Sequence, residues 1–228
     1  SERPNETVMY GAHWDGYGVG TPDASGDTIY NAAVDNATGV AALLELAHAF
    51  ADAPRPKRSV VFAAWSGEEA GLLGSTYYAA NPVWPLETTV ANINVDSLLP
   101  GTEIDPNVVV IGKGKNQLDE VLARHATATG RTLIADPAPQ AGAFYRSDHF
   151  PLALKGVPAL FPAAGFTGAS AASRDYVQNR MKAAPLPGSL STSAQPPCSS
   201  TRALTRARPT PGPPRSRRTN RSKTWACR

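Results

Sequence analysis

Residues 59–69 read Ser-Val-Val-Phe-Ala-Ala-Trp-Ser-Gly-Glu-Glu, an apolar run that ends in a Ser-Gly turn and two adjacent carboxylates. A continuous apolar run of this length, bounded by turn residues, is typical of a strand buried on both faces of a parallel sheet. We therefore predict a strand over residues 59–65. Ligand sites in open α/β sheets lie beyond the carboxyl ends of the strands, so Glu68 and Glu69 are candidates for a functional site.

Short β-rich runs alternate with helical patterns in the rest of the chain, which favours an α/β domain with a largely parallel sheet. Apolar residues at helical spacing predict a helix over residues 40–51, and a second helix over 118–129 is expected to end at Gly130. The remaining strands are predicted at residues 7–12, 90–95, 108–111, 132–135 and 158–161.

The charge of the chain is unevenly distributed. Its 228 residues, 42% of them apolar, suffice for one sizeable core. Residues 1–181 contain 12 Lys or Arg and 19 Asp or Glu, a net charge of −7, whereas residues 182–228 contain 10 Lys or Arg and no acid. We therefore predict one folded domain over residues 1–180 and a disordered, basic tail, rich in Pro, Ser and Arg, over residues 181–228.

Several classes of protein are disfavoured by composition. No apolar stretch approaches the roughly 20 residues that a membrane span requires. Both cysteines, Cys198 and Cys227, lie in the tail, so the folded part has no thiol for a zinc site or a nucleophile. No Gly-x-Ser-x-Gly sequence occurs, and residues 112–114 are too short for a phosphate-binding loop. The chain opens on Ser-Glu-Arg-Pro without Met or a leader, so we expect it to be clipped at its N-terminus.

Three more metal-ligating side chains occupy positions like those of Glu68 and Glu69. His13 follows the strand predicted at 7–12, Asp96 ends the strand at 90–95, and Asp35 precedes the helix at 40–51. Carboxylates gathered in one crevice repel one another unless a positive ion lies among them. Oxygen and nitrogen ligands without thiolate fit zinc, and a pair of metal ions can share one carboxylate and activate a water.

Each of these residues also has a simpler interpretation. A lone His-x-Asp is more often a surface pair than a ligand pair, and a Glu-Glu pair is usually solvated. Asp35 and Asn36 could simply be the N-cap of the following helix. His48 and His125 fall inside the predicted helices and are expected to be structural or exposed, and Tyr77 and Tyr78 are expected to pack in the core. The joint pattern is what favours a metal site.

Five ordered sequence blocks resemble the di-zinc metallopeptidase family that includes bacterial leucyl aminopeptidases and glutamate carboxypeptidase. The likeness covers roughly residues 7–180. It implies a zinc exopeptidase-like fold, a three-layer α/β/α sandwich around a mostly parallel mixed sheet, and makes the predicted domain a catalytic domain that is incomplete at both ends. The blocks are Gly-Ala-His-Trp-Asp (11–15), Asn-Ala-Ala-Val-Asp-Asn-Ala-Thr-Gly (31–39), Ser-Gly-Glu-Glu-Ala-Gly-Leu-Leu-Gly-Ser (66–75), Ile-Asn-Val-Asp (93–96) and Tyr-Arg-Ser-Asp-His (145–149).

The resemblance also implies a ligand set for two Zn²⁺ ions. His13 and Asp96 correspond to terminal ligands of one zinc, and Asp35 corresponds to the bridging carboxylate. Glu69 corresponds to a ligand of the second zinc.

Three further residues correspond to catalytic groups of the family. Glu68 is the expected general base, which takes a proton from the bridging water and later delivers it to the leaving amine. Asp15 is expected to hydrogen-bond His13 and fix its tautomer. Tyr145 is a candidate donor to the oxyanion of the tetrahedral intermediate.

The chain departs from the family pattern at its C-terminal end. The family places a second-zinc histidine well beyond the Ser-Asp-His block, but no histidine follows His149 here. We expect weak binding or loss of the second zinc, with His149 as a possible substitute ligand. We also expect a less stable domain with reduced or absent activity. Out-of-frame translation is one hypothesis for residues 181–228, and an ordinary basic tail is the other.

The leading functional prediction is a metallo-aminopeptidase, a hydrolase that acts on peptides. A glutamate-type carboxypeptidase is an alternative that needs Arg146 or Arg174 to bind a substrate carboxylate, and the missing histidine leaves a non-catalytic binding protein open. Specific nucleic-acid binding is disfavoured, because Trp225 is the tail's only aromatic residue. No membrane partner is expected. The resemblance implies a secreted or periplasmic location.

Overall fold

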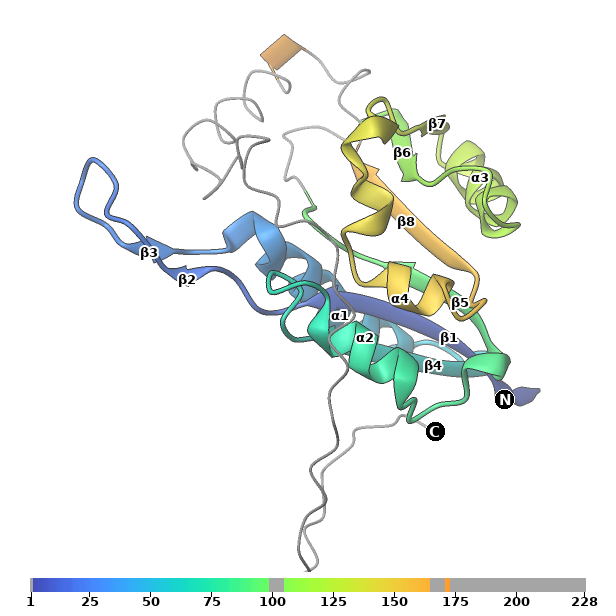
Figure 1. Ribbon diagram of the computed structural model, residues 1–228. Helices are drawn as coiled ribbons and strands as arrows, with labels where there is room; N and C mark the ends of the chain where they lie inside the picture. The colour runs from blue at the N-terminus through green and yellow to red at the C-terminus, as the bar shows by residue number, and fades with distance from the viewer. Residues whose placement is uncertain (1, 99–104, 165–170, 173–228) are drawn as a thin grey trace, which may run out of the picture. The chain divides into compact units, whose positions relative to one another are not determined.

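A six-stranded mixed sheet forms the centre of the protein (Figure 1). The computed structural model describes residues 2–98, 105–164 and 171–172. The strand order is β4-β1-β5-β8-β6-β7. The strands are β1 (Arg3–His13), β4 (Arg58–Trp65), β5 (Thr89–Asn94), β6 (Asn107–Ile111), β7 (Thr132–Ala135) and β8 (Ala159–Ala164).

Most neighbouring strands run parallel. β1 pairs in parallel with β4 and β5, β5 with β8, and β6 with β7. Within this six-stranded sheet of the described residues, only the pairing of β6 with β8 is antiparallel. Every predicted strand is present, and the sheet is mostly parallel and mixed, as expected. The expectation that the strand at 59–65 is buried on both faces is wrong, because β4 lies at the edge of the sheet and most of its residues are only half-buried.

Strand β1 begins earlier than residue 7, where the sequence places its start. The backbone N–H of Arg3 donates to the carbonyl of Lys57, and Arg58 Nε donates to Glu6 Oε2 at 2.6 Å. These polar contacts tie the exposed, charged beginning of β1 to the beginning of β4. The apolar pattern does not report them, because it detects only the buried part of a strand.

Four helices are present in the described residues: α1 (Thr38–Asp52), α2 (Leu73–Ala80), α3 (Leu118–Ala128) and α4 (His149–Ala153). The predicted helices at 40–51 and 118–129 correspond to α1 and α3. The sequence did not predict α2 or α4, which are too short for a clear apolar period. Shorter helical turns are η1 (Ala33–Ala37), η2 (Leu86–Thr88), η3 (Pro139–Ala141) and η4 (Ala143–Tyr145).

A small antiparallel hairpin of β2 (Gly18–Val19) and β3 (Ile29–Tyr30) was also not predicted. It lies in the sequence between His13 and Asp35. Each strand has only two residues, which is too short for an alternating pattern to be recognised.

The core divides between the two faces of the sheet, because successive strand residues point to opposite sides. Met9 packs with residues of α2 and α4, whereas Ala12 packs with Leu43 of α1. The rings of Tyr10 and Phe62 stack 5.7 Å apart on the α1 side. Helices therefore cover both faces, which confirms the predicted sandwich arrangement.

The two adjacent tyrosines of α2 behave differently. Tyr78 packs on Trp65 with ring centroids 5.3 Å apart, as predicted for a core residue. Tyr77 is 70% exposed, so its predicted packing role is wrong. Adjacent residues of a helix point about 100° apart, so the two tyrosines face different ways, and the short apolar pattern of α2 did not resolve which one faces the sheet.

No helix in the described ranges is long and apolar enough to cross a membrane. The predicted tail at 181–228 lies outside the described residues, as do Arg174, Cys198, Trp225 and Cys227. The expected disorder of the tail therefore stays a prediction.

Candidate metal centre

Three parallel neighbours, β4, β1 and β5, end at the same edge of the sheet. His13 is the last residue of β1 and pairs in register with Trp65, the last residue of β4. The backbone N–H of Val95, just after β5, donates to the carbonyl of Gly11 at 2.8 Å. The segments that follow these strands therefore begin side by side, and they carry Glu68, Glu69 and Asp96.

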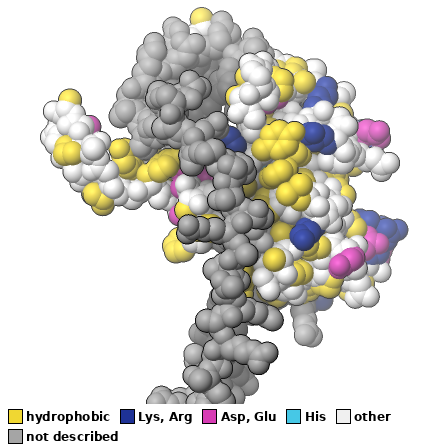
Figure 2. Space-filling model, in the orientation of Figure 1, with side chains coloured by type: hydrophobic (Ala, Val, Ile, Leu, Met, Phe, Trp, Pro, Cys, Tyr) yellow, Lys and Arg dark blue, Asp and Glu magenta, His cyan; other side chains and the backbone are white. Residues whose placement is uncertain are grey.

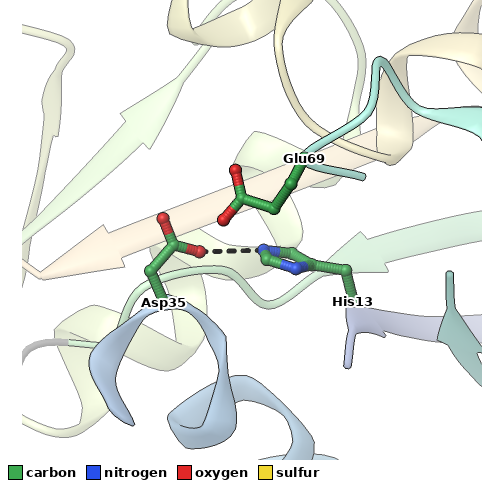
Figure 3. Close-up of side chains that lie close together, drawn as sticks. All are labelled: His13, Asp35 and Glu69. Atoms are coloured by element: carbon green, nitrogen blue, oxygen red, sulfur yellow. Dashed lines mark ion pairs between the residues drawn. The ribbon is translucent and has the colours of Figure 1, made fainter. Parts of the chain in front are cut away.

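His13 lies at the centre of the candidate site. Its Nε2 atom is 2.9 Å from Asp35 Oδ1 and 3.4 Å from Asp96 Oδ1. Figure 3 shows the first contact, with the Glu69 carboxylate beside both residues. Ligand atoms of His13, Asp35 and Glu69 lie within 4.8 Å of one another, as do those of His13, Glu68 and Asp96. The structure thus brings together five side chains that the sequence singled out.

Asp35 reaches His13 because its neighbour Asn36 takes the capping role. The Asn36 Oδ1 atom accepts from the N–H groups of Gly39 at 2.9 Å and Ser97 at 3.1 Å, and its Nδ2 donates to the Val95 carbonyl at 3.0 Å. A Cβ at Gly39 would lie 2.3 Å from Asn36 Oδ1, so only glycine fits there. Asn36 fixes the beginning of α1 against the end of β5. The capping alternative therefore applies to Asn36, and Asp35 turns toward the histidine.

Asp15 fixes the turn that carries Glu68 and Glu69. Its two carboxylate oxygens accept from the backbone N–H groups of Glu68 and Glu69, both at 3.2 Å. Gly67 enters this turn with φ +75, a conformation that favours glycine. Asp15 therefore connects the segment after β1 with the segment after β4.

Asp15 also contacts His13, partly through its backbone. His13 Nδ1 is 3.2 Å from the Asp15 carbonyl oxygen and 3.7 Å from Oδ1. A neutral His13 that donates Nδ1–H to this carbonyl presents its Nε2 lone pair toward Asp35 and Asp96. That orientation is the one a metal ligand needs.

Burial and the proximity of these carboxylates raise the pKa values of several groups. Burial, together with the charges of Asp96, Asp148 and Glu69, raises the pKa of Glu68 to about 8, although His13 opposes the shift. Burial also raises the pKa of Glu69. Burial disfavours a charged His13, but the carboxylates of Asp35 and Asp96 outweigh it and raise the His13 pKa to about 11. The cluster therefore favours a positive charge at His13.

Several ligand atoms of the cluster lack a hydrogen-bond partner among the described residues. They are His13 Nε2, Asp35 Oδ1 and Glu69 Oε1; all three are buried, and the first two face each other as an ion pair at 2.9 Å without making a hydrogen bond. Buried polar atoms of a native protein are normally satisfied. A cation bound between them satisfies all three at once. One imidazole and several carboxylates form a set of nitrogen and oxygen donors that fits zinc.

Three polar residues that the sequence did not single out support the site. Asn94 Nδ2 donates to Ser147 Oγ at 2.7 Å, and Ser147 Oγ donates to Asp96 Oδ2 at 2.6 Å. The Glu69 carboxylate interacts with the Tyr17 hydroxyl, and this interaction contributes most to raising the Tyr17 pKa to about 12. Ser147 and Asn94 lie in the sequence blocks quoted above, but Tyr17 lies in the unpredicted hairpin region and gave no signal.

Residues on the hairpin side of the site are unusually exposed for their type. Figure 2 shows hydrophobic side chains along the hairpin and acidic side chains beside its base. Trp14, Val19 and Ile29 are all more than half exposed. These side chains belong to the segment that joins two of the candidate ligands, His13 and Asp35.

The remaining predicted residues lie around the cluster rather than in it. His149 is fully buried, and its ring packs on Phe144 and Phe161 with centroids 4.8 and 5.1 Å away. Burial lowers its pKa to about 4. It belongs to neither ligand group found in the described residues. Tyr145 is 56% exposed and packs against Phe150. The structure does not bring either residue into the cluster.

The two helical histidines are both exposed, as expected. His48 Nδ1 lies 3.6 Å from Asp52 on the surface of α1. His125 is exposed in the last turn of α3. Neither belongs to the candidate site.

The fold and the side-chain cluster together place this chain in a class of α/β proteins that have a candidate metal centre at the carboxyl ends of parallel strands. Comparison with known families then gives a definite assignment. Peptidase family M28 matches residues 1–184, and the chain belongs to this family. The predicted resemblance is confirmed.

Individual relatives agree with this assignment. A "Probable zinc metalloprotease" of Pyrenophora tritici-repentis is 41% identical over 96 residues, which are 42% of this chain and 21% of the relative. "Aminopeptidase NAALADL1" of Mus musculus is 38% identical over 99 residues, 41% of this chain and 12% of the relative. The chain thus spans about a fifth or less of the length of these relatives.

Solved structures share the fold at lower identity. The LapA aminopeptidase of Legionella pneumophila has a TM-score of 0.55 and 21% identity, covering 76% of this chain and 44% of that one. BSAP, described as a zinc aminopeptidase from Bacillus subtilis, has a TM-score of 0.55 and 22% identity, covering 79% and 43%. These likenesses confirm the predicted α/β fold class.

Proposed function

We propose that residues 1–180 form the catalytic domain of a zinc-dependent exopeptidase that removes N-terminal amino acids from peptides. The observation that carries this proposal is the convergence of His13 with the carboxylates of Asp35, Glu68, Glu69 and Asp96. Membership of a peptidase family and similarity to proteins named as aminopeptidases support it.

In this proposal the cluster holds two Zn²⁺ ions. His13, Asp35 and Asp96 would hold one, and Asp35 and Glu69 would hold the other, with Asp35 shared. Zinc in such a site acts as a Lewis acid that polarises the scissile carbonyl and lowers the pKa of a bound water. The buried atoms of His13, Asp35 and Glu69 that make no hydrogen bond to the described residues are the ligand atoms that favour this assignment.

Glu68 serves as the general base. Its carboxylate lies beside His13 and Asp96, and its backbone is fixed by Asp15. Burial and neighbouring acids raise its pKa toward neutrality, which suits a group that must accept a proton from water and then donate it to the leaving amine. Glu68 therefore moves the proton in both steps.

The charge of the site favours a substrate amine over a substrate carboxylate. The four carboxylates of the cluster balance the charge of two Zn²⁺ ions, and the Asp15 carboxylate, 3.7 Å from His13, adds a negative charge that complements a peptide's N-terminal ammonium. A glutamate-type carboxypeptidase instead needs a cation that grips the substrate carboxylate. Arg146, the candidate in the described residues, has an exposed side chain next to Ser147. We therefore favour the aminopeptidase.

The second zinc would have fewer protein ligands than the first. Asp35 and Glu69 are only two protein ligands, and His149 packs among aromatic rings beside the site. Its role as a substitute ligand stays a prediction, as does the role of Tyr145 as an oxyanion donor. A secreted or periplasmic location likewise rests on the resemblance alone.

Metal content and substrate choice test the proposed function together. We expect at least one tightly bound zinc per chain and hydrolysis of an amino-acid p-nitroanilide but not of an N-blocked dipeptide. Asp35→Asn should lose both zinc and activity, and Asp52→Asn, an exposed acid of α1, is the matched control that should keep both. Zinc-free wild-type protein without hydrolytic activity would favour a non-catalytic binding protein.

A further inference from the structure

A hydrogen-bond relay of three residues ends on Asp96, a candidate zinc ligand. Asn94 lies at the end of β5, and its Nδ2 atom is 2.7 Å from Ser147 Oγ. Ser147 Oγ in turn is 2.6 Å from Asp96 Oδ2. Asn94 and Ser147 are 2% and 3% exposed, so water cannot readily replace either contact.

The direction of this relay is fixed by chemistry. An amide nitrogen can only donate, so Ser147 Oγ must accept from Asn94. The single hydroxyl hydrogen of Ser147 is then free to point at Asp96 Oδ2. Hydrogen bonds to a carboxylate are short and strong, which agrees with the 2.6 Å distance.

The relay occupies one oxygen of Asp96 and leaves the other facing the cluster. Asp96 Oδ1 is 3.4 Å from His13 Nε2, and besides that ion pair it accepts a local hydrogen bond from Ser97 at 3.1 Å. Ser147 thus holds the carboxylate plane so that Oδ1 points at the candidate metal position. Ser147 also joins the segment before α4 to the segment just after β5. Ser147 and Asp96 are 51 residues apart in the sequence.

We propose that Ser147 is a positioning residue that orients Asp96 as a one-oxygen zinc ligand, with Asn94 setting the direction of the Ser147 hydroxyl. This inference rests on the proposed function, because it requires zinc at the cluster. Ser147 touches no reacting atom. It acts only through the ligand that it holds.

The structure offers a matched control for this role. Ser75 is fully buried, and its Oγ donates to Asp148 Oδ1 at 2.6 Å. The length and chemistry of this bond equal those of the bond from Ser147 to Asp96, and both serines are buried, but Asp148 belongs to neither ligand group of the described residues. Ser75→Ala and Ser147→Ala therefore remove equivalent hydrogen bonds, and only the second acts on a candidate ligand.

The experiment measures zinc affinity by competition with a chromophoric chelator, and the visible spectrum of the Co²⁺-substituted protein. Ser147→Ala should weaken zinc binding about 10–100-fold and shift the Co²⁺ bands, as outer-shell substitutions do. Ser147→Thr, which retains the hydroxyl, should restore most of the affinity. Asn94→Ala should give a smaller loss in the same direction, and it tests the relay even where Ser147→Ala does not fold. Ser75→Ala should leave affinity and spectrum unchanged.

Two results would overturn the role of Ser147 while leaving the proposed function intact. One is wild-type affinity and an unaltered Co²⁺ spectrum in a folded Ser147→Ala protein, or in Asn94→Ala if that protein alone folds. The other is an equal loss of affinity in Ser75→Ala, which would mean that general destabilisation is responsible. Failure of the wild-type protein to bind zinc would instead overturn the proposed function itself.

Discussion

Replacing Asn36 with alanine should uncouple the candidate metal centre from the sheet. Asn36 is 1% exposed and makes three hydrogen bonds, to Gly39 N–H, Ser97 N–H and the Val95 carbonyl. The substitution leaves three buried backbone groups without their partner. Each such group costs about 1–2 kcal/mol, so Asn36→Ala should lower the free energy of unfolding by roughly 3–6 kcal/mol. That loss is comparable with the total stability of many domains.

The consequence for the site follows from the neighbouring residue. Asn36 holds the turn from which Asp35 reaches His13, so loss of Asn36 should also weaken zinc binding. Urea unfolding measures the first effect, and zinc competition with a chelator measures the second. Where the substituted protein is too unstable for purification at 25 °C, lower temperature and saturating zinc should recover it, since ligands that bind the folded state stabilise it.

Asn116→Ala is the matched control. Asn116 Nδ2 donates to the Ala159 carbonyl at 2.6 Å, and its Oδ1 accepts from Leu118 N–H at 2.9 Å at the beginning of α3. It is thus another asparagine that ties a helix to a strand, but outside the cluster. It should cost about 1–3 kcal/mol and leave zinc affinity unchanged. Equal effects of the two substitutions on zinc affinity would refute the reasoning.

Three further substitutions test separate parts of the site. Glu68→Gln should lower kcat by about 10²–10⁴-fold with zinc content unchanged, because it removes the proton acceptor and not a ligand; loss of zinc would contradict this role. Tyr17→Phe removes the hydroxyl that interacts with Glu69, so it should weaken the second zinc and spare the first in a stepwise titration. Asp148 is buried, and burial raises its pKa from 3.8 to about 6. Its contribution to stability is therefore complete below about pH 3.8 and is lost as pH rises to about 6. This pH dependence of the free energy of unfolding is on the order of 3 kcal/mol, and Asp148→Asn, measured in the presence of a metal chelator, should flatten it. The same pH profile in wild type and Asp148→Asn would contradict this prediction.

The sequence predicted the fold where burial dominates. Strands such as β5, which is mostly buried, and β4, which is half-buried at the edge of the sheet, are short apolar runs with clear ends. The residues after parallel strands must meet at one edge of the sheet. His13, Glu68, Glu69 and Asp96 could therefore be placed together before any geometry was known. Asp35 followed from its position at the beginning of α1 and from the family resemblance.

The features that escaped prediction depend on contacts between distant segments. The apolar patterns of β6 and β8 do not encode strand direction, so the sequence did not show which pair of the expected mixed sheet is antiparallel. The relay from Asn94 through Ser147 exists only because the segment before α4 approaches β5. Tyr17 reaches Glu69 from a hairpin whose strands are too short to recognise. Asn36 was noticed only as a helix cap, although its side chain also binds two groups just after β5.

The most direct test of the account is zinc K-edge X-ray absorption on the purified wild-type protein loaded with zinc. We predict a first shell of nitrogen and oxygen atoms only, at roughly 2.0–2.1 Å, with the outer scattering of imidazole from His13, and the loss of that imidazole signal in His13→Ala. A sulfur shell at about 2.3 Å, or a spectrum that His13→Ala leaves unchanged, would contradict the claim that this cluster is the zinc site.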